Sequence, residues 1–260
     1  MTSNTPDNFY LFLISNAEKD NHIGDFRVPL NHPISLEGQY EVALTHIMFP
    51  LTFDNITERR SEAEYFENTI LCVLRESNRN VKLDVEEVRI PPAYYNDSKV
   101  LVDKINEAVL TQLKPRIPDM HQVFSYDPIT RRCSVKLRPK LKQLGLSFKL
   151  AFHLGLPKQM KEDVPVAPYP MHTANDFVFI YCDIVDMQMV SNVMAPLLRI
   201  VSPKGVSGEM CEITFDRPQY LRLLKNNFDR VKVEFKNDLN EIVDFHSGKI
   251  SLTLHFRRRR

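Results

Sequence analysis

Residues 229–256, DRVKVEFKNDLNEIVDFHSGKISLTLHF, carry the clearest signal of the fold class. In VKVEF and in ISLTLHF, apolar and polar residues alternate, which is the pattern of a β-strand with one buried face. The polar residues between the two runs favour a connection, and together the runs are typical of a hairpin that closes the chain. The last strand-like run ends at Phe256. The C-terminal region is therefore predicted to be β-structure.

The region before this stretch has the same character. Short strand-like runs follow one another with turn residues between them: DFVFIYCDIV (176–185), PLLRIVS (196–202), MCEITFD (210–216) and YLRLLK (220–225). Such runs, spaced by about ten residues and without strand–helix alternation, indicate an antiparallel sandwich or barrel.

The N-terminal part adds further strands. FYLFLISN (9–16) is rich in aromatic and aliphatic residues and predicts a buried strand. DFRVPL (25–30) contains Pro29, which cannot donate a ladder hydrogen bond, so that strand is expected at a sheet edge or to end there. ISLEGQYEVALTHIMFP (34–50) turns at Glu37-Gly38 and continues as a strand with one face in the core.

The middle of the chain combines hairpins with helices. A polar loop is expected over 54–69, followed by two hairpins, formed by 69–76 with 81–90 and by 121–126 with 132–137. Residues 98–113 predict an amphipathic helix, because apolar residues recur at helical spacing after the capping residues 96–98. A second helical run, 147–155, ends at a glycine suited to a C-cap.

Composition bounds the class of protein. With 260 residues, 43% hydrophobic and 26% charged, the chain is typical of a globular protein, and a net charge of +1 gives no global attraction to nucleic acid or to an anionic membrane. No run approaches the roughly 18 apolar residues of a membrane span, and the N-terminus does not resemble a signal peptide. We expect neither a membrane protein nor one secreted by that route.

Motifs for catalysis or metal binding are missing from the sequence. Its eight histidines show no HxH or HExxH spacing, its serines lack a GxSxG setting, and its seven glycines form no phosphate loop. The cysteines are interpreted as reduced thiols in strands or core, rather than as disulfides or metal ligands: Cys72, Cys133, Cys182 and Cys211. No catalytic residue, metal or cofactor is predicted, and the chain is not expected to be an enzyme.

An ordered series of segments resembles the penton (minor capsid) proteins of Polinton/Maverick-type viruses and transposable elements. The series covers most of the chain: FYLFLISN, ISLEGQYEVALTHIMFP, VRIPPAYY, VFSYDPITRRCSV, FVFIYCDIVDMQMVSNVMAPLLRIV, PQYLRL, FDRVKVEFKND and GKISLTLHFRRRR. Two residues depart from the family pattern: Tyr40 stands where tryptophan is frequent, and Ala93 where IPPGYY is common.

The resemblance implies a mainly β protein, an antiparallel jelly-roll β-sandwich with an inserted α+β region. It assigns 1–60 and 165–260 to a discontinuous sandwich and 61–164 to the insertion. Two consecutive domains divided near 165, within the proline-rich KEDVPVAPYP (161–170), are the alternative. The insertion is preferred because the N-terminal strands are too few for an independent sandwich.

The function implied by the resemblance is structural. Such a chain forms the fivefold vertices of an icosahedral capsid as a homopentamer, contacts a double-jelly-roll major capsid protein, and is made in the host cytoplasm or nucleus before it enters the virion. The alternative is a ligand- or receptor-binding β-sandwich module, expected to show an exposed aromatic platform or a calcium loop. An enzyme on a jelly-roll scaffold would need a tight His/carboxylate cluster.

Two groups of residues are candidate contacts. Met187, Met189 and Met194 are a candidate subunit contact, since thioether side chains fill irregular interfaces, although core packing is the plainer interpretation. The C-terminal Arg257, Arg258, Arg259 and Arg260 are a candidate contact to packaged DNA or to an acidic internal partner. A solvated, disordered end is the alternative interpretation of this basic tail.

Overall fold

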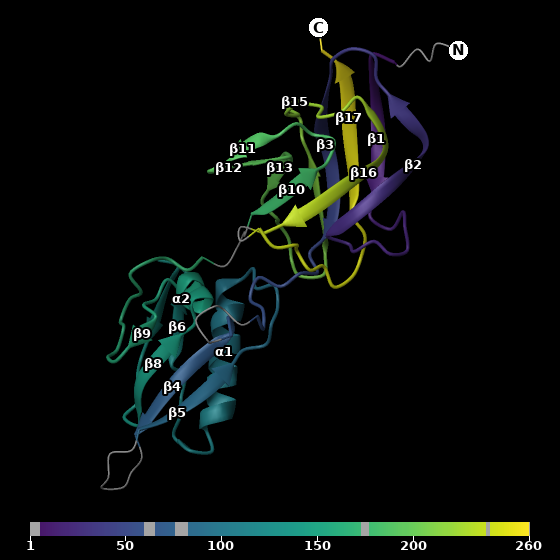
Figure 1. The fold of residues 1–260 in the computed structure, drawn as a ribbon. Helices are drawn as coiled ribbons and strands as arrows, with labels where there is room; N and C mark the ends of the chain where they lie inside the picture. The colour runs from purple at the N-terminus through teal and green to yellow at the C-terminus, as the bar shows by residue number, and fades with distance from the viewer. Residues whose placement is uncertain (1–5, 60–65, 76–82, 173–176, 238–239, 260) are drawn as a thin grey trace. The chain divides into compact units, whose positions relative to one another are not determined.

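The computed structural model describes residues 6–59, 66–75, 83–172, 177–237 and 240–259. The chain forms two compact units (Figure 1). Met1–Phe53 and Asn175–Arg260 make the first, called here the terminal unit, and Asp54–Ala174 make the second, called the inserted unit.

The terminal unit is a sandwich of two antiparallel sheets. One sheet has the order β1-β17-β3-β14 with the short β15 beside β3, and the other has the order β13-β10-β16-β2. The strands are β1 (Asn8–Ile14), β2 (Asp25–Ser35), β3 (Tyr40–Pro50), β10 (Val178–Cys182), β13 (Leu197–Val201), β14 (Met210–Thr214), β15 (Leu221–Arg222), β16 (Asn227–Lys236) and β17 (Ser251–Arg258). The strand orders β1-β17-β3-β14 and β2-β16-β10-β13 are those of a jelly roll, so the predicted fold class is confirmed.

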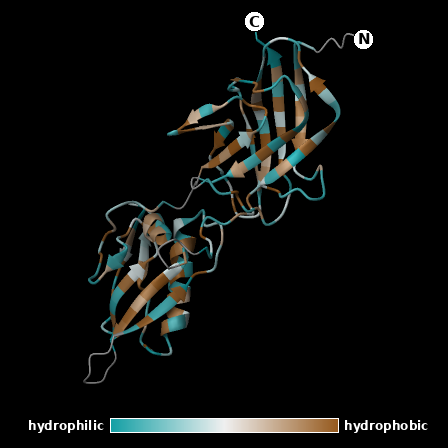
Figure 2. Ribbon diagram, in the orientation of Figure 1, coloured by the Kyte–Doolittle hydropathy of each residue, from teal (hydrophilic) through white to brown (hydrophobic). Residues whose placement is uncertain are grey.

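The predicted C-terminal hairpin is wrong. β16 pairs with β10 and β2, whereas β17 pairs with β1 and β3 in the other sheet. Buried and more exposed residues alternate along much of both strands, so each sheet turns one apolar face toward the core between them. Figure 2 shows hydrophobic and hydrophilic residues mixed along the strands of this unit. Alternation identifies a half-buried strand but does not say in which sheet its partner lies.

Aromatic side chains fill the core between the two sheets. Phe26, Phe49 and Phe235 are almost fully buried, and the ring of Phe235 lies 6.4 Å from that of Phe26 and 6.3 Å from that of Phe49. Phe245, from the connection between β16 and β17, places its ring 5.8 Å from Phe235. The connection therefore closes one end of the core.

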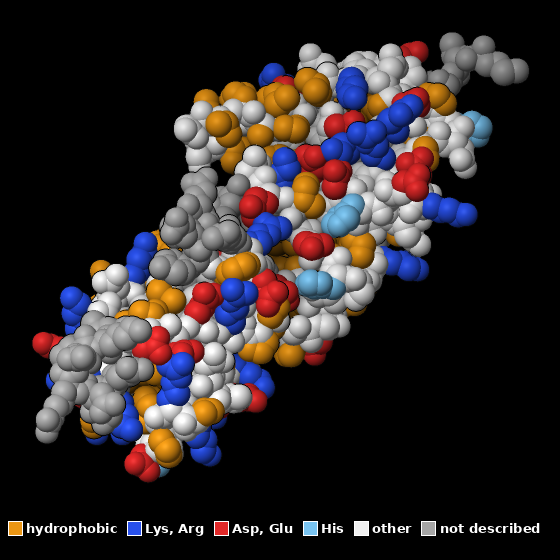
Figure 3. All heavy atoms as spheres, turned by 60° about the horizontal axis from the view of Figure 1, so that its bottom comes forward, with side chains coloured by type: hydrophobic (Ala, Val, Ile, Leu, Met, Phe, Trp, Pro, Cys, Tyr) orange, Lys and Arg blue, Asp and Glu red, His pale blue; other side chains and the backbone are white. Residues whose placement is uncertain are grey.

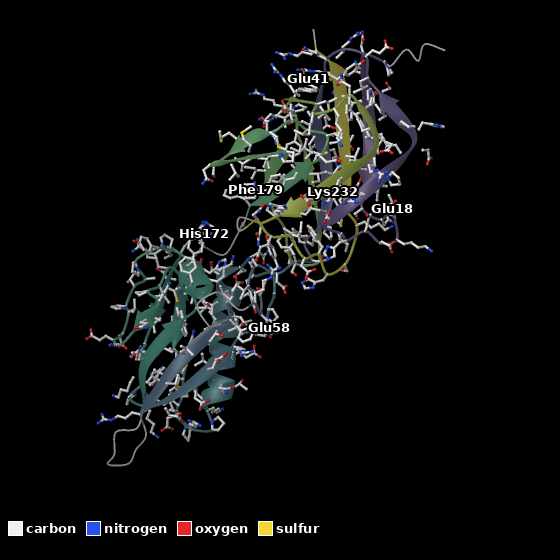
Figure 4. The ribbon with its side chains drawn as sticks, in the orientation of Figure 1. Glu18, Glu41, Glu58, His172, Phe179 and Lys232 are labelled. Carbon is white, nitrogen blue, oxygen red and sulfur yellow. The ribbon has the colours of Figure 1, made fainter. Side chains whose placement is uncertain are left out.

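The outer face of β16 is charged. The Lys232 Nζ lies 2.5 Å from a carboxylate oxygen of Glu234 and 3.2 Å from one of Asp25 on β2 (Figure 4). β2 is an edge strand, as Pro29 predicted, but it continues past the proline to Ser35. Pro29 pairs with Arg230, and the register with β16 shifts between Pro29 and Ile34.

The inserted unit packs two helices with a four-stranded sheet of order β5-β4-β8-β9 and a two-stranded hairpin β6-β7. Its elements are β4 (Thr69–Arg75), β5 (Leu83–Arg89), α1 (Ser98–Leu113), β6 (Phe124–Asp127), β7 (Arg132–Val135), β8 (Leu141–Leu146), α2 (Phe148–Leu154) and β9 (Gln159–Met160). Both predicted hairpins and both predicted helices are confirmed.

Helix α1 is fixed at its start and along its inner face. The Asp97 side chain accepts hydrogen bonds from the backbone N–H groups of Lys99 and Val100, which satisfies two free donors of the first turn. The amide of the buried Asn106 joins the helix to β6: its oxygen accepts from the Phe124 N–H at 3.0 Å, and its nitrogen donates to the Phe124 carbonyl at 2.8 Å. The sequence analysis did not predict these hydrogen bonds of Asn106.

The boundaries between the units lie after residues 53 and 174. The sequence interpretation placed them after residues 60 and 164 instead. Hydrogen bonds account for the difference. The Ile56 N–H donates to the Ala93 carbonyl, and the Met171 N–H donates to the Arg131 carbonyl at 2.7 Å. The proline-rich segment thus belongs to the inserted unit. Of the predicted loop 54–69, residues 60–65 lie outside the described residues.

Replacing Ile105 with alanine should lower the free energy of unfolding of the inserted unit by roughly 2–5 kcal/mol. Ile105 is fully buried on α1, so the truncation leaves a cavity in the core. Urea unfolding followed by hydrogen exchange at residues 98–113 measures the loss. Val100→Ala on the exposed face of the same helix is the control, with an expected change within about 0.5 kcal/mol. Equal effects of the two variants would contradict the burial of Ile105.

Candidate functional site

A methionine-rich hairpin extends from the terminal unit (Figure 1). It consists of β11 (Gln188–Val190) and β12 (Val193–Ala195), which pair so that Met189 faces Met194. These two side chains are 70% and 57% exposed, so core packing does not account for them. We define the methionine hairpin by the exposed residues Met187, Met189, Val193 and Met194. The sequence marked three of them but not the hairpin that presents them.

The second exposed apolar surface lies on the edge strand β1. Tyr10, Phe12 and Ile14 point away from the core, and Phe12 is 67% exposed. We call these three residues the edge stripe. The prediction of a buried strand is therefore wrong for the outer face of β1. It holds for the inner face, where Phe9 stacks on Phe256 of β17 with ring centroids 4.7 Å apart.

The sheet surface next to the edge stripe is aromatic. Tyr10 stacks on the ring of His255 at 4.5 Å, and the Tyr220 hydroxyl lies 2.7 Å from the His255 Nδ1. Burial, together with the neighbouring Arg257 guanidinium, lowers the pKa of His255. Both effects favour the neutral form of the imidazole.

The two apolar surfaces lie at opposite sides of the sandwich. β1 forms one edge of its sheet, on the same side as β2, whereas the methionine hairpin connects β10 with β13 at the other side (Figure 1). Figure 3 shows hydrophobic side chains gathered at the side from which the hairpin extends. Exposed apolar residues that cluster in this way mark interaction surfaces more often than scattered ones do.

Arg257, Arg258 and Arg259 do not form a free tail. β17 runs to Arg258, so the predicted end of the strand at Phe256 is wrong. The Arg257 Nε lies 2.5 Å from a carboxylate oxygen of Glu41, near the end of β17 in Figure 4, and its guanidinium lies 3.4 Å from the Tyr220 ring centroid. The Arg258 N–H donates to the Asp7 carbonyl at 2.7 Å.

Arg259 differs from the two arginines before it. Its N–H donates to the Gln39 carbonyl at 2.8 Å, while its side chain, with that of Arg222, lines a polar hollow of about 410 Å³. Arg260 lies outside the described residues. The arginines as a DNA or partner contact stay a prediction. Arg222, which also lines the hollow, was not among the residues predicted for that contact.

Deleting Arg257–Arg260 should destabilise the terminal unit by about 1–3 kcal/mol, because the deletion removes backbone hydrogen bonds to Asp7 and Gln39 and the ion pair with Glu41. Thermal unfolding measures this loss. Arg259→Gln combined with Arg260→Gln keeps the strand and should leave the melting temperature unchanged while reducing the salt dependence of DNA binding. A deletion without any loss of stability would contradict the ordered arrangement.

Reactive groups are dispersed in the described part of the chain. Each cysteine lies buried in a different strand, β4, β7, β10 or β14, as predicted, and burial raises the pKa of Cys72, Cys133 and Cys182 to about 12. His46 pairs with Glu212 at 2.8 Å, but the described residues contain no cluster of three or more metal-ligating side chains. None of the described helices has the length and apolar character needed to cross a membrane.

Comparison with known proteins finds a solved structure of similar fold. No protein-family model and no curated protein sequence matches the chain. The crystal structure of the selenomethionine-labelled penton protein of mavirus is similar, with a TM-score of 0.53 at 13% sequence identity, covering 96% of this chain and 99% of that chain. The two chains share a fold. Mavirus is related to the Maverick/Polinton elements, the group to which the sequence resemblance pointed.

Proposed function

We propose that this protein is a structural capsid protein that forms a ring of five copies at the fivefold vertices of an icosahedral virion. The fold shared with the mavirus penton protein supports this role. In this proposal the chain has no enzymatic activity, contacts a double-jelly-roll major capsid protein, and is located in the virion capsid.

The observation that carries the proposal is the placement of the two apolar surfaces on opposite sides of the sandwich. If the edge stripe of one copy contacts the methionine hairpin of the next, the interface is heterologous. Such an interface closes into a ring when the rotation between copies fits, about 72° for five copies. Burial of Phe12 from one copy against Met189 from the next would supply the hydrophobic driving force, at about 25 cal/mol per Å² of apolar surface buried.

The C-terminal arginines enter the proposal in a secondary role. Arg259 and Arg222 line the same hollow, so a ring would present several such hollows together. Several weak contacts to phosphate or carboxylate groups, one from each copy in the ring, together give a higher overall affinity than one contact alone. Packaged DNA or an acidic internal partner is therefore a suitable ligand.

The expected result is a fivefold ring at high protein concentration, alone or with the major capsid protein. Light scattering coupled to size-exclusion chromatography measures the mass, and class averages of negatively stained particles show the symmetry. A compact monomer under both conditions would overturn the proposal and favour the ligand-binding β-sandwich module. A twofold dimer would contradict a heterologous interface.

A further inference from the structure

The inserted unit carries a groove that the capsid proposal does not use. The groove is a hollow of about 400 Å³ between α2 and the segment 169–172. The rings of Phe148, Phe152 and Tyr169 line it together with Leu156. Phe152 is 53% exposed and Tyr169 72% exposed. Its volume falls at the lower end of cavities that bind small ligands and leaves room for a bulky apolar side chain.

Helix α2 is apolar on both of its faces. Leu150 and Leu154 are buried in the core of the inserted unit, while Phe148 and Phe152, one helical turn apart, face outward. A surface helix normally presents mainly polar residues on its outer side, whereas α2 places two exposed aromatic rings there beside Lys149. The outer face of α2 therefore has the character of a surface that is covered in use.

Backbone contacts hold the groove open in a fixed shape. Gly155 ends α2 with a φ of +65°, and a Cβ atom there would lie 2.2 Å from the Tyr169 carbonyl oxygen. The Tyr169 N–H donates to the Gly155 carbonyl at 3.3 Å, and the His172 N–H donates to the His153 carbonyl at 2.8 Å. Since both walls are tied together, a ligand would find the groove already formed.

The described residues that line the groove include the cationic side chain of Lys158. The Lys158 Nζ lies 4.7 Å from the centroid of the Phe148 ring, and His172, labelled beside α2 in Figure 4, has its ring 5.4 Å from that of Phe152. None of the described residues that line the groove is acidic. The sequence from 128 to 161 contains no aspartate or glutamate, but has lysine or arginine at 131, 132, 136, 138, 140, 142, 149, 158 and 161.

We infer that this groove binds an acidic peptide segment of a partner protein, with one bulky apolar residue of the segment held between Phe148, Phe152 and Tyr169. The aromatic walls supply contact area at low entropic cost, as in interaction hot spots. Lys158 and the basic segment around it attract the flanking carboxylates. A free anion would make no use of the aromatic walls. A peptide that is apolar but uncharged would make no use of Lys158, so an acidic peptide with an apolar residue fits the groove best. This inference does not depend on ring formation.

The test measures the fluorescence anisotropy of a labelled peptide, Asp-Glu-Asp-Phe-Leu-Asp-Glu-Asp, titrated with the full-length protein. We expect saturable binding that weakens with salt. Phe152→Ser and Tyr169→Ser should each reduce the affinity about tenfold or more, and Lys158→Glu should do likewise. Ile129→Ser is the matched control, because Ile129 is 91% exposed elsewhere in the same unit, and it should leave the affinity unchanged.

Two variant peptides test the two halves of the recognition. Replacing Phe-Leu with Ser-Ser, or every acidic residue with lysine, should abolish binding. Circular dichroism verifies that each protein variant is folded, and Tyr169→Ser lies outside α2, so loss of that helix cannot mimic its effect. The inference is overturned if the first peptide does not bind, if the groove variants bind it as well as the unmodified protein does, or if only vesicles of phosphatidylcholine and phosphatidylserine bind.

Discussion

Replacing Phe235 with alanine is expected to lower the free energy of unfolding of the terminal unit by about 3–5 kcal/mol. The Phe235 side chain is fully buried on β16, and its ring meets those of Phe26 and Phe49 from both sheets and that of Phe245 from the closing connection. Truncation removes contacts between the two layers of the sandwich at once. Domains of this size are stable by only about 5–15 kcal/mol, so a large share of the stability would be lost.

The measurement has to separate the two units, because unfolding of a chain with two units need not be a single transition. Hydrogen exchange read by mass spectrometry provides that separation. Strands β3, β10, β16 and β17 should lose protection in the variant, while α1 and β4 keep theirs. Phe12→Ala removes the same ring from an exposed position and should cost well under 1 kcal/mol. Loss of protection across both units would show that they do not unfold separately.

The elements that the sequence predicted well are those held by local interactions. Helix α1 begins at Ser98, after the Asp97 cap, and ends at Leu113, as the spacing of its apolar residues required. The hairpins β4-β5 and β6-β7 join neighbouring segments, so turn chemistry and alternation were sufficient to find them. Periodicity and capping are encoded within a few residues, and a single sequence displays them.

The pairing of strands that are far apart in the sequence cannot be predicted from periodicity, capping or turn residues. VKVEF and ISLTLHF look like the two arms of a hairpin, but β16 and β17 lie in different sheets. The likeness to known penton proteins supplied the jelly-roll order, whereas alternation alone indicated only a sandwich. Likewise, the end of β17 at Arg258 depends on partners such as Tyr40, whose position is set by the whole sheet.

The candidate surfaces were predicted in part for the same reason. The methionines stood out by composition, but their exposure depends on the β11-β12 turn, which the sequence analysis did not identify. FYLFLISN predicted a buried strand because both of its faces are apolar. The structure leaves Tyr10, Phe12 and Ile14 uncovered within one chain, because β1 is an edge strand whose outer face no other element covers, and an apolar run alone does not reveal this.

Two single substitutions should each abolish ring formation, and mixing the two variants should restore one contact. Phe12→Asp places a carboxylate in the edge stripe, and Met189→Asp places one in the methionine hairpin. Burying an unpaired charge costs several kcal/mol, so each contact should weaken by about a hundredfold or more. Alone, each variant should remain monomeric at concentrations where the unmodified protein is expected, under the proposal, to form rings.

The mixture distinguishes a heterologous interface from other arrangements. The Phe12→Asp protein keeps an intact methionine hairpin, and the Met189→Asp protein keeps an intact edge stripe, so one contact between unlike variants remains. An equimolar mixture should therefore form a dimer with one copy of each variant and no larger species, which native mass spectrometry resolves. In an isologous contact of stripe with stripe, Met189→Asp alone would still dimerise. That result, or a mixture that stays monomeric, would rule out the contact between stripe and hairpin, because only this contact predicts repair by the opposite variant.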